Sequence, residues 1–384
     1  MATRRLDPSR IAAVDTARGL AMVGMIAAHS LDPHELSWTD PASWEEIASG
    51  RSAILFAVLG GISLALTTGR TRPPTGSDLL AARLRVVVRA CLLFVIGGIL
   101  TVIVGRRSLA VILEFYAVMF VFAVPFLTWR PRRLLTAIAV WAVIAPILLW
   151  WLPAVLPGHK PPLSGIIDLA ATGSYPALLW IVFILIGLAI GRSDVTAPQT
   201  RKRLLGWGIA SAVIGYAAAW SATRLFIAPT DDTTHGVVSL LTAEPHSGTL
   251  FEIAGSAGVV AAILGLLLSL PSGVLRILAP LTAIGYLPLT VYTGHVLSMV
   301  IFMKPETNGT HFFLISVAVI AVAALLWTRF LGRGPLERMI TWVARAAVRT
   351  RELPLAATPG PAPRNAGLRE ESGKGPMVAV PIDQ

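Results

Sequence analysis

The first apolar stretch of the chain carries three ionisable side chains at helical spacing. Residues 10–34 have the sequence RIAAVDTARGLAMVGMIAAHSLDPH, which is long enough to cross a bilayer and contains Asp15, Arg18 and His29. At about 100° per residue, Arg18 and His29 fall roughly 60° and 40° from Asp15, so all three share one stripe of a helix. Ionisable groups in a bilayer cost roughly 2.5–3.5 kcal/mol each and usually face the interior of a bundle, where they mark functional sites. Because imidazole can act as a general base or nucleophile near neutral pH, this helix is expected to carry chemistry.

Further polar side chains fall near the ends of later apolar runs, at two depths. If the first helix runs outward, His29 lies at its outer end, about 21 Å from Asp15 at roughly 1.5 Å per residue. The side chains expected near the outer end are His29, Arg51, Glu114, His246, Glu252 and His295, whereas Asp15, Arg18 and Arg89 are expected nearer the cytoplasm. His295 shares a helical face with Tyr292 and Ser298. The pattern therefore predicts a site with two ends.

The composition indicates a polytopic membrane protein. The 384 residues are 55% hydrophobic and 14% charged, with a mean hydropathy of +0.71, and no soluble catalytic domain is evident. The net charge of +11 comes from basic residues between apolar runs, as the positive-inside rule expects, so nucleic acid is not an expected partner. The single cysteine, Cys91, excludes an intrachain disulfide. No two histidines or carboxylates show ligand spacing on one helix, so no metal site is expected.

The apolar runs position these residues. Runs of about 18 or more mostly apolar residues lie near 12–31, 51–68, 86–104, 109–128, 134–156, 174–191, 204–227, 250–270, 277–303 and 312–331. We therefore predict an all-α polytopic membrane protein with a bundle of about ten transmembrane helices. Basic residues concentrate in alternate connections, which predicts an integral protein of the inner or plasma membrane with both termini cytoplasmic.

The last part of the chain departs from this pattern. Residues 335–349 can form a short basic amphipathic helix on the cytoplasmic surface. Residues 351–384 are rich in Pro, Ala and Gly and have no periodic apolar face, which predicts a disordered cytoplasmic tail. The expected division is thus a membrane domain over residues 1–350 and a tail over 351–384.

Three short motifs of the chain are informative when they are considered together. They are Asp15-Thr-Ala-Arg18-Gly19-Leu-Ala, then Gly50-Arg51-Ser52-Ala-Ile-Leu-Phe56 followed by Gly60-Gly61, and Gly332-Arg333-Gly334-Pro335-Leu336-Glu337. Across about residues 10–345 the chain resembles the heparan-α-glucosaminide N-acetyltransferase-like group and the bacterial domain-of-unknown-function 418 and 1624 families. The acyltransferase-3 family opens with a similar first helix, but the Gly-Pro-Leu-Glu ending favours the first group.

The resemblance implies transfer of an acetyl group from cytoplasmic acetyl-CoA to an acceptor beyond the membrane. That acceptor is expected to be a sugar, a lipid or a cell-envelope hydroxyl or amine. The histidine of the family lies in the first loop after the first span. His34 occupies that loop here, whereas His29 lies at the helix end, so either can be the equivalent.

If the protein transfers an acyl group, each candidate residue can be given a role. We expect His29 to deprotonate the acceptor or carry the acyl group, oriented by Glu252 or Glu114, with His246 as the second choice. Arg51 or a backbone amide would stabilise the oxyanion. The candidates are Asp15, His29, His34, His246 and Glu252 for catalysis, Arg51, Glu114, Tyr292 and His295 for the substrate, and Arg18, Arg83, Arg85 and Arg89 for the phosphates of CoA.

Simpler structural roles and two other functions remain open. Asp15 and Arg18 can form an i,i+3 ion pair, the arginines can be ordinary positive-inside residues, and His295 can hydrogen-bond across helices. Charges at two depths also suit a transporter or flippase, or a structural membrane protein whose charges merely pair. The expected partners are the lipid bilayer and the acceptor, with a homodimer left open.

Overall fold

The computed structural model describes residues 11–31, 49–105, 109–155, 163–226, 237–304 and 307–349. Within these ranges every regular element is a helix. The loop histidine His34 and the expected tail over 351–384 lie outside the described residues.

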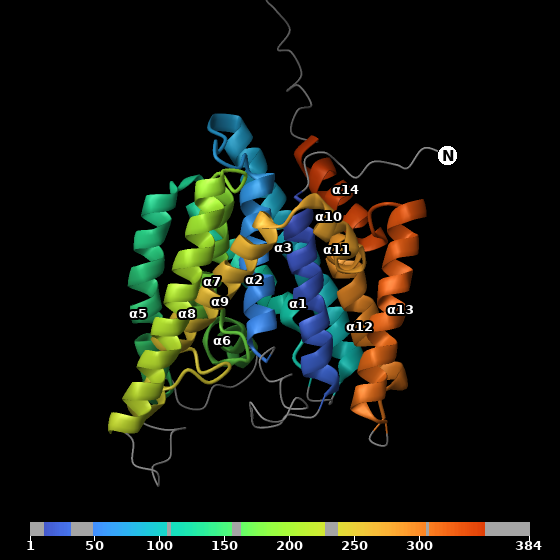
Figure 1. Ribbon diagram of the computed structural model, residues 1–384. Coiled ribbons are helices and arrows are strands. Elements are labelled where there is room, and N and C mark those ends of the chain that lie inside the picture. The colour runs from blue at the N-terminus through green and yellow to red at the C-terminus, as the bar shows by residue number, and fades with distance from the viewer. Residues whose placement is uncertain are drawn as a thin grey trace, which may run out of the picture.

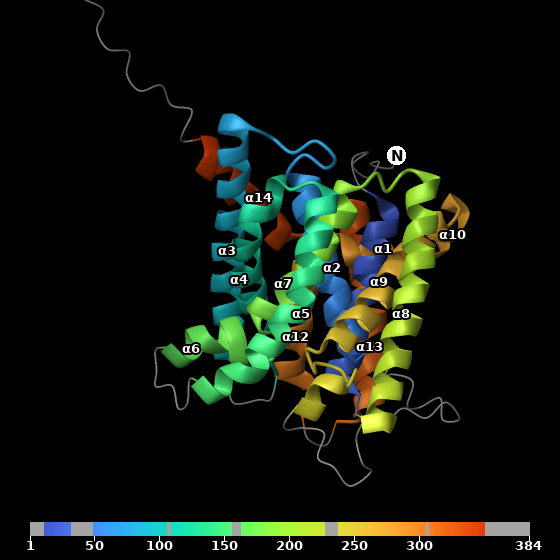
Figure 2. The same cartoon turned by 90° about the vertical axis from the view of Figure 1, so that its left-hand side faces the viewer.

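The helices pack side by side as a bundle (Figures 1 and 2). Their bounds are α1 (Ala12–Ser30), α2 (Arg51–Thr67), α3 (Gly76–Val104), α4 (Ile112–Ala123), η2 (Val124–Thr128), α5 (Pro131–Val155), α6 (Leu163–Ile167), η3 (Asp168–Thr172), α7 (Ala177–Arg192), α8 (Pro198–Phe226), η4 (Val237–Leu241), α9 (Leu250–Ser269), α10 (Ser272–Ile277), α11 (Ala279–Tyr286), α12 (Pro288–Phe302), α13 (Gly309–Phe330) and α14 (Pro335–Arg349). The end that carries α10, α14 and the start of α1 is called the α14 end. The opposite end, where α1 finishes, is called the histidine end.

The expected number of about ten spans is not confirmed. By length and composition, five described helices can cross a membrane, namely α3, α5, α8, α9 and α13. Two bent pairs, α6–η3 with α7 and α11 with α12, raise the number to seven if each pair is one span. The difference arises because α2 and the α4–η2 segment are short, and because α1 carries charged residues that reduce its apolar character.

Apolar side chains cover the outer face of the bundle. Val102 of α3, Val213 of α8 and Ile315 of α13 are 81%, 62% and 63% exposed. Broad exposed apolar surfaces are favourable where lipid replaces water, and helices satisfy their own backbone hydrogen bonds there. Together with the long apolar helices, this surface indicates an integral multi-pass membrane protein.

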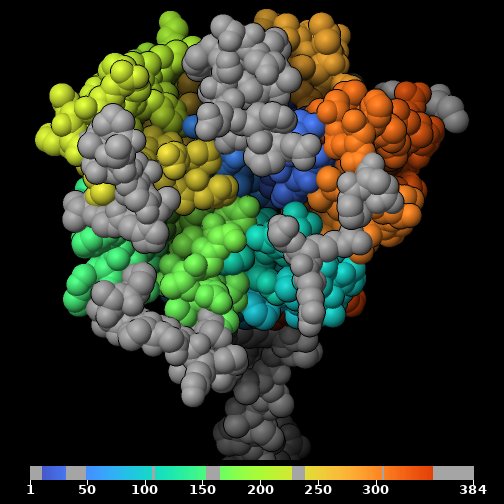
Figure 3. All heavy atoms as spheres, turned by 90° about the horizontal axis from the view of Figure 1, so that it is seen from below, coloured from blue at the N-terminus to red at the C-terminus, as the bar shows by residue number. Residues whose placement is uncertain are grey.

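The first helix lies inside the bundle. It packs against α2, α9, α11, α12 and α13, and the blue residues of α1 and α2 occupy the centre of the histidine end between α9 and α13 (Figure 3). A Cβ atom at Gly19 would collide with the backbone of Leu281, and one at Gly285 with the backbone of Asp15. The glycine of the first motif therefore allows α1 and α11 to touch backbone to backbone, as small residues do between membrane helices.

Small residues also join the helices around this centre. Gly208 and Gly215 of α8 face Gly255 and Gly258 of α9 so closely that a Cβ atom at any of them would meet the opposite helix. On the other side of the bundle, Gly61 of α2 lies against the backbone of α7. Such contacts replace hydrophobic burial as the cause of helix association in lipid.

The second bent pair breaks sharply inside the bundle. α11 and α12 meet at an angle of 89°, and Pro288 begins α12 directly after Leu287. Proline fits the first turn of a helix but cannot continue the preceding one, which explains the position of the break. The start of α12 consequently lies within the bundle, close to α14.

Candidate functional site

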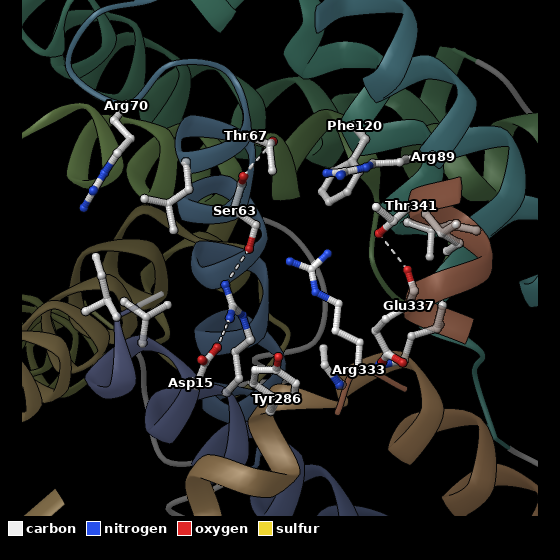
Figure 4. A pocket seen from close by; sticks show the side chains of 18 residues that line it. Asp15, Ser63, Thr67, Arg70, Arg89, Phe120, Tyr286, Arg333, Glu337 and Thr341 are labelled. Atoms are coloured by element: carbon white, nitrogen blue, oxygen red, sulfur yellow. Dashed lines mark hydrogen bonds and ion pairs between the residues drawn. The ribbon is translucent and has the colours of Figure 1, made fainter. Parts of the chain in front are cut away.

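A cavity of about 430 Å³ opens at the α14 end. Its walls come from α1, α2, α3, α4, α11, α12 and α14, so segments far apart in the sequence meet there (Figure 4). Four arginines line it, namely Arg18, Arg70, Arg89 and Arg333. The only carboxylates among its lining residues are Asp15 and Glu337, and both are engaged by neighbouring groups. The cavity is therefore positively charged.

Asp15 positions Arg18 on the wall of this cavity. The Asp15 side chain is buried and forms an ion pair with the Arg18 guanidinium. A second guanidinium nitrogen of Arg18 donates a hydrogen bond to the Ser63 hydroxyl at 2.7 Å. The two residues thus form the i,i+3 pair that the sequence leaves as one alternative, and that pair also presents a cation to the cavity.

Glu337 fastens α14 to the start of α12. One carboxylate oxygen accepts hydrogen bonds from the backbone amides of Leu289 and Thr290, at 2.8 and 3.0 Å. The other accepts a hydrogen bond from the Thr290 hydroxyl at 2.5 Å. A carboxylate is stabilised at a helix N-terminus by the free amides and the helix dipole. The glutamate of the Gly-Pro-Leu-Glu motif therefore has a structural role, because it caps a helix that begins inside the bundle.

Two further cavities share lining residues with the first. One of about 240 Å³ is lined by Arg85, Arg89, Arg333 and Arg345. Another of about 150 Å³ is lined mainly by apolar side chains and reaches Tyr116 and Tyr292. The shared residues are Thr67, Arg89, Arg333 and Thr341 on the cationic side, and Arg18, Ser63, Leu93, Phe120, Pro288 and Leu289 on the apolar side. The cavities thus adjoin one another in a series that changes from cationic to apolar.

The series extends along α2 from Thr67 to Phe56. That interval corresponds to about 16 Å of helix at about 1.5 Å per residue. Along α12 the series runs from Pro288 to Tyr292, and His295 follows about one turn later. The apolar end therefore points from the α14 end towards the histidine end.

The predicted phosphate-binding arginines are partly brought together. Arg18, Arg85 and Arg89 line the adjoining cavities. Arg83 is absent from the walls of all the cavities described here. The Nε atom of Arg89 is buried and has no hydrogen-bond partner within the described part of the chain. Sequence reasoning missed Arg70, Arg333 and Arg345. Arg333 lies inside the third motif, which was a usable signal, but the other two look like ordinary positive-inside residues.

At the histidine end, His29 of α1 meets His295 of α12. The Nδ1 atom of His29 lies 3.3 Å from the Nε2 atom of His295, and the rings are parallel within 2° at a centroid distance of 5.5 Å. His295 is 1% exposed, and its Nδ1 atom has no partner among the described residues. One imidazole must donate and the other accept in this contact, so the two tautomers are linked.

Neither predicted carboxylate contacts His29 within the described residues. Glu114 accepts a hydrogen bond from the Thr101 hydroxyl at 3.1 Å. Glu252 accepts hydrogen bonds from the backbone amides of His246 and Gly248, at 2.7 and 2.6 Å. Its own amide donates to the N-cap residue Thr249 at 3.0 Å, so Glu252 completes a helix cap. The partner that orients His29 is instead His295.

His246 belongs to a separate aromatic cluster. Its ring stacks on Trp180 at a centroid distance of 6.1 Å and meets Tyr175 edge-on at 5.5 Å. Partial removal from water by this packing, followed by the nearby charge of Arg51, lowers the pKa of the His246 imidazole even though its side chain reaches the surface. A lowered pKa favours the neutral form of this imidazole.

Arg51 and Tyr292 both make contacts with groups from other helices. The Nε atom of Arg51 donates to the Tyr216 hydroxyl at 3.1 Å, and the guanidinium lies 5.4 Å from the centre of that ring. The Tyr292 hydroxyl accepts a hydrogen bond from the backbone amide of Ile112 at 3.2 Å. Tyr292 therefore caps the start of α4 and presents its ring to the apolar cavity.

These contacts define three clusters. They are the arginines at the α14 end, the His29–His295 pair, and the aromatic cluster around His246. The arginines at the α14 end can hold phosphate groups by charge-assisted hydrogen bonds, and the imidazole pair can accept and pass a proton. Within the described ranges, no group of three or more His, Cys, Asp or Glu side chains could hold a metal ion.

Comparison with known proteins identifies a family for this chain. The family model for "Heparan-alpha-glucosaminide N-acetyltransferase, catalytic" matches residues 10–227, which is more than half of the chain. That range contains Asp15, Arg18, His29 and Arg89, while His295 and Arg333 lie beyond it. A comparison with curated proteins gives no match. On the strength of the family match, the chain belongs to the heparan-α-glucosaminide N-acetyltransferase catalytic family, a family of membrane acetyltransferases.

Proposed function

We propose that this protein transfers an acyl group from a CoA thioester bound at the α14 end to an acceptor bound at the histidine end. The observation that carries the proposal is the series of adjoining cavities. Its cationic part suits a nucleotide phosphate, and its apolar part ends about one helical turn before His295. A CoA thioester has the same order of groups along its length, with charged phosphates at one end and the acyl group at the other.

The phosphates of CoA occupy the cationic cavities in this proposal. Arg85 and Arg89 of α3 line one space together with Arg333, which lies just before α14. Guanidinium groups bind phosphate oxygens through two parallel hydrogen bonds and stay charged at all relevant pH values. The Arg89 Nε atom, which is buried without a partner in the described residues, would gain an acceptor from such a ligand.

The pantetheine arm passes the Arg18–Ser63 contact, where a guanidinium and a hydroxyl face the cavity. Beyond this point the lining is mainly apolar. The thioester is thereby directed towards Tyr292 and the imidazole pair. We assign the cationic part to the cytoplasmic side, on the positive-inside rule, and the imidazole pair to the far side.

His29 acts as the base in this proposal. Its Nδ1 atom faces His295, which leaves Nε2 for the acceptor. The acceptor hydroxyl or amine gives its proton to His29 as it attacks the thioester carbon. The carbon–sulfur bond then breaks, and the departing CoA thiolate takes up the proton that His29 received, which returns His29 to its neutral form. His295 holds the ring and its tautomer as a positioning residue.

Release of free CoA thiol from acetyl-CoA tests this function. The purified protein in detergent should release thiol in the presence of candidate sugar or lipid acceptors, and His29→Ala should not. Equilibrium binding of CoA, measured on the same samples, keeps the test valid when the correct acceptor is missing. A folded protein that neither binds CoA nor turns over acetyl-CoA would contradict the proposal.

One observation favours a second function, transport of a small polar or lipid-linked substrate. The break between α11 and α12 places a helix start inside the bundle, and discontinuous helices line the binding sites of many transporters. In this protein Glu337 already occupies the freed amides of Leu289 and Thr290. Movement of an unmodified solute into proteoliposomes, without thiol release, would favour transport over transfer.

A further inference from the structure

We propose that the corner between α13 and α14 binds the headgroups of anionic lipids in the leaflet at the α14 end. The binding surface, called the corner patch, consists of six exposed side chains, namely Arg329, Phe330, Leu331, Arg338, Met339 and Trp342. None of the six lines the cavities at the α14 end. The inference therefore concerns the outer surface of the bundle and does not depend on the proposed acyl transfer.

The helix α14 has two different faces. At about 100° per residue, the residues that line the cavities fall on one arc of the helix, and the exposed residues fall on another. The arc towards the cavities carries Glu337, Ile340, Thr341 and Ala344. Arg338, Met339 and Trp342 belong to the other arc, and Trp342 is 72% exposed. The outward face thus combines apolar side chains with a positive charge.

The lipid-facing surface of α13 leads to this patch. Ile315, Val319, Val322, Leu326 and Phe330 recur at helical spacing and are each between 52% and 68% exposed. They form one stripe about 22 Å long at about 1.5 Å per residue, on a helix long and apolar enough to cross a membrane. The stripe ends at Phe330 in the last turn of α13, where the Arg329 guanidinium lies 6.0 Å from the centre of the Phe330 ring. The patch therefore lies where the apolar surface meets charge (Figure 1).

Hydrogen bonds hold the corner in one shape. The Arg338 guanidinium donates to the Leu331 carbonyl, and the Trp327 indole donates to the Arg333 carbonyl at 3.3 Å. The amide of Gly332 donates to the Trp327 carbonyl at 3.0 Å, and its φ of 76° fits the left-handed position that ends a helix. Arg338 is thereby kept beside the end of the stripe on α13.

The chemistry of the patch fits an anionic lipid surface. Its six side chains include two arginines and no carboxylate, and the nearby Glu337 is engaged on the opposite face of α14. Tryptophan is favoured at the boundary between hydrocarbon and headgroups. The positive-inside rule assigns the α14 end to the cytoplasmic leaflet, whose anionic lipids attract each nearby arginine enough to raise affinity about five-fold.

The test measures which lipid lies beside Trp342. The purified full chain is reconstituted into phosphatidylcholine bilayers with a minor fraction of brominated phosphatidylglycerol or brominated phosphatidylcholine, because bromine quenches nearby tryptophan fluorescence. The signal of Trp342 is the difference between the unmodified protein and Trp342→Phe. Trp207→Phe isolates a matched tryptophan of α8, which is 73% exposed. Brominated phosphatidylglycerol should quench Trp342 at a mole fraction at least five-fold lower than brominated phosphatidylcholine does. The two lipids should quench Trp207 equally.

Two double variants separate the effect of charge from a folding defect. Arg329→Gln with Arg338→Gln should lose the preference at Trp342, whereas Arg329→Lys with Arg338→Lys should keep most of it, because the lysines retain both charges. Salt at about 1 M, where the Debye length falls to about 3 Å, should weaken the preference in the unmodified protein. Equal quenching of Trp342 by the two lipids, the same preference at Trp207, or a preference that survives both glutamines would overturn the proposal.

Discussion

Ionisable side chains have different surroundings at the two ends of α1. At the α14 end, Arg18 is paired with Asp15 and belongs to a group of arginines around open cavities. At the histidine end, His29 meets a second imidazole that is 1% exposed. Charges that remain at the wall of an open cavity can bind a charged ligand, whereas an enclosed imidazole is suited to moving a proton. We therefore propose binding at one end and proton transfer at the other.

The largest effect should follow from removal of the base. His29→Ala should lower kcat about 10²- to 10⁴-fold, the range that general acid–base catalysis contributes. Binding of CoA should stay within about two-fold, because the substitution lies about three helical turns from Arg18. Thiol release and calorimetric binding on the same preparation check both statements. Unchanged thiol release would remove His29 from the chemistry.

Asp15→Asn should chiefly affect stability. The change leaves the Arg18 guanidinium without its carboxylate partner in a buried position, and breaking such a pair costs about 3–5 kcal/mol. Thermal unfolding in detergent measures the loss. A matched variant, Asp194→Asn, removes a carboxylate from the exposed loop after α7 and should change the unfolding temperature little. Equal stability of Asp15→Asn and the unmodified protein would show that the pair does not fix Arg18.

Arg89→Gln should weaken CoA binding about 10- to 100-fold, because hydrogen bonds to charged groups are worth about 1.5–3 kcal/mol. The control is Arg203→Gln, which removes an exposed arginine of α8 outside the cavities. That control should bind CoA like the unmodified protein. If both substitutions weaken binding equally, general attraction by positive charge would explain it better than a built site.

The smallest effect is expected at the cap of α12. Glu337→Gln keeps an oxygen that can accept hydrogen bonds from the amides of Leu289 and Thr290. It removes the negative charge beside the N-terminus of α12, and the interaction of that charge with the helix dipole is worth about 0.3–1 kcal/mol. CoA binding should change less than three-fold. A large gain in CoA binding would instead mean that the carboxylate repels the phosphates directly.

Some of this arrangement could be predicted from the sequence. The apolar runs and the first motif indicated a helical membrane protein, and the predicted family is confirmed. The stripe on α1 depends only on helical spacing within one segment. It therefore identified Asp15, Arg18 and His29 as residues to examine, although their roles stay predictions.

Contacts between distant segments could not be predicted in the same way. The partner of His29 is 266 residues away on α12, and the cavity at the α14 end is built from seven helices. Glu252 looked like a catalytic carboxylate, but a Thr-x-x-Glu pattern before an apolar run is also a capping signal, which its contacts bear out. The count of about ten spans is not confirmed because an apolar run in the sequence does not show how long its helix is, and α2 and the α4–η2 segment are short.

The contrast between the two ends is tested most directly by CoA binding, measured side by side on His29→Ala and Arg89→Gln. We predict that His29→Ala binds CoA like the unmodified protein, while Arg89→Gln binds it about 10- to 100-fold more weakly. Equal loss of binding in the two variants, or no loss in Arg89→Gln, would contradict the division into a binding end and a proton-transfer end.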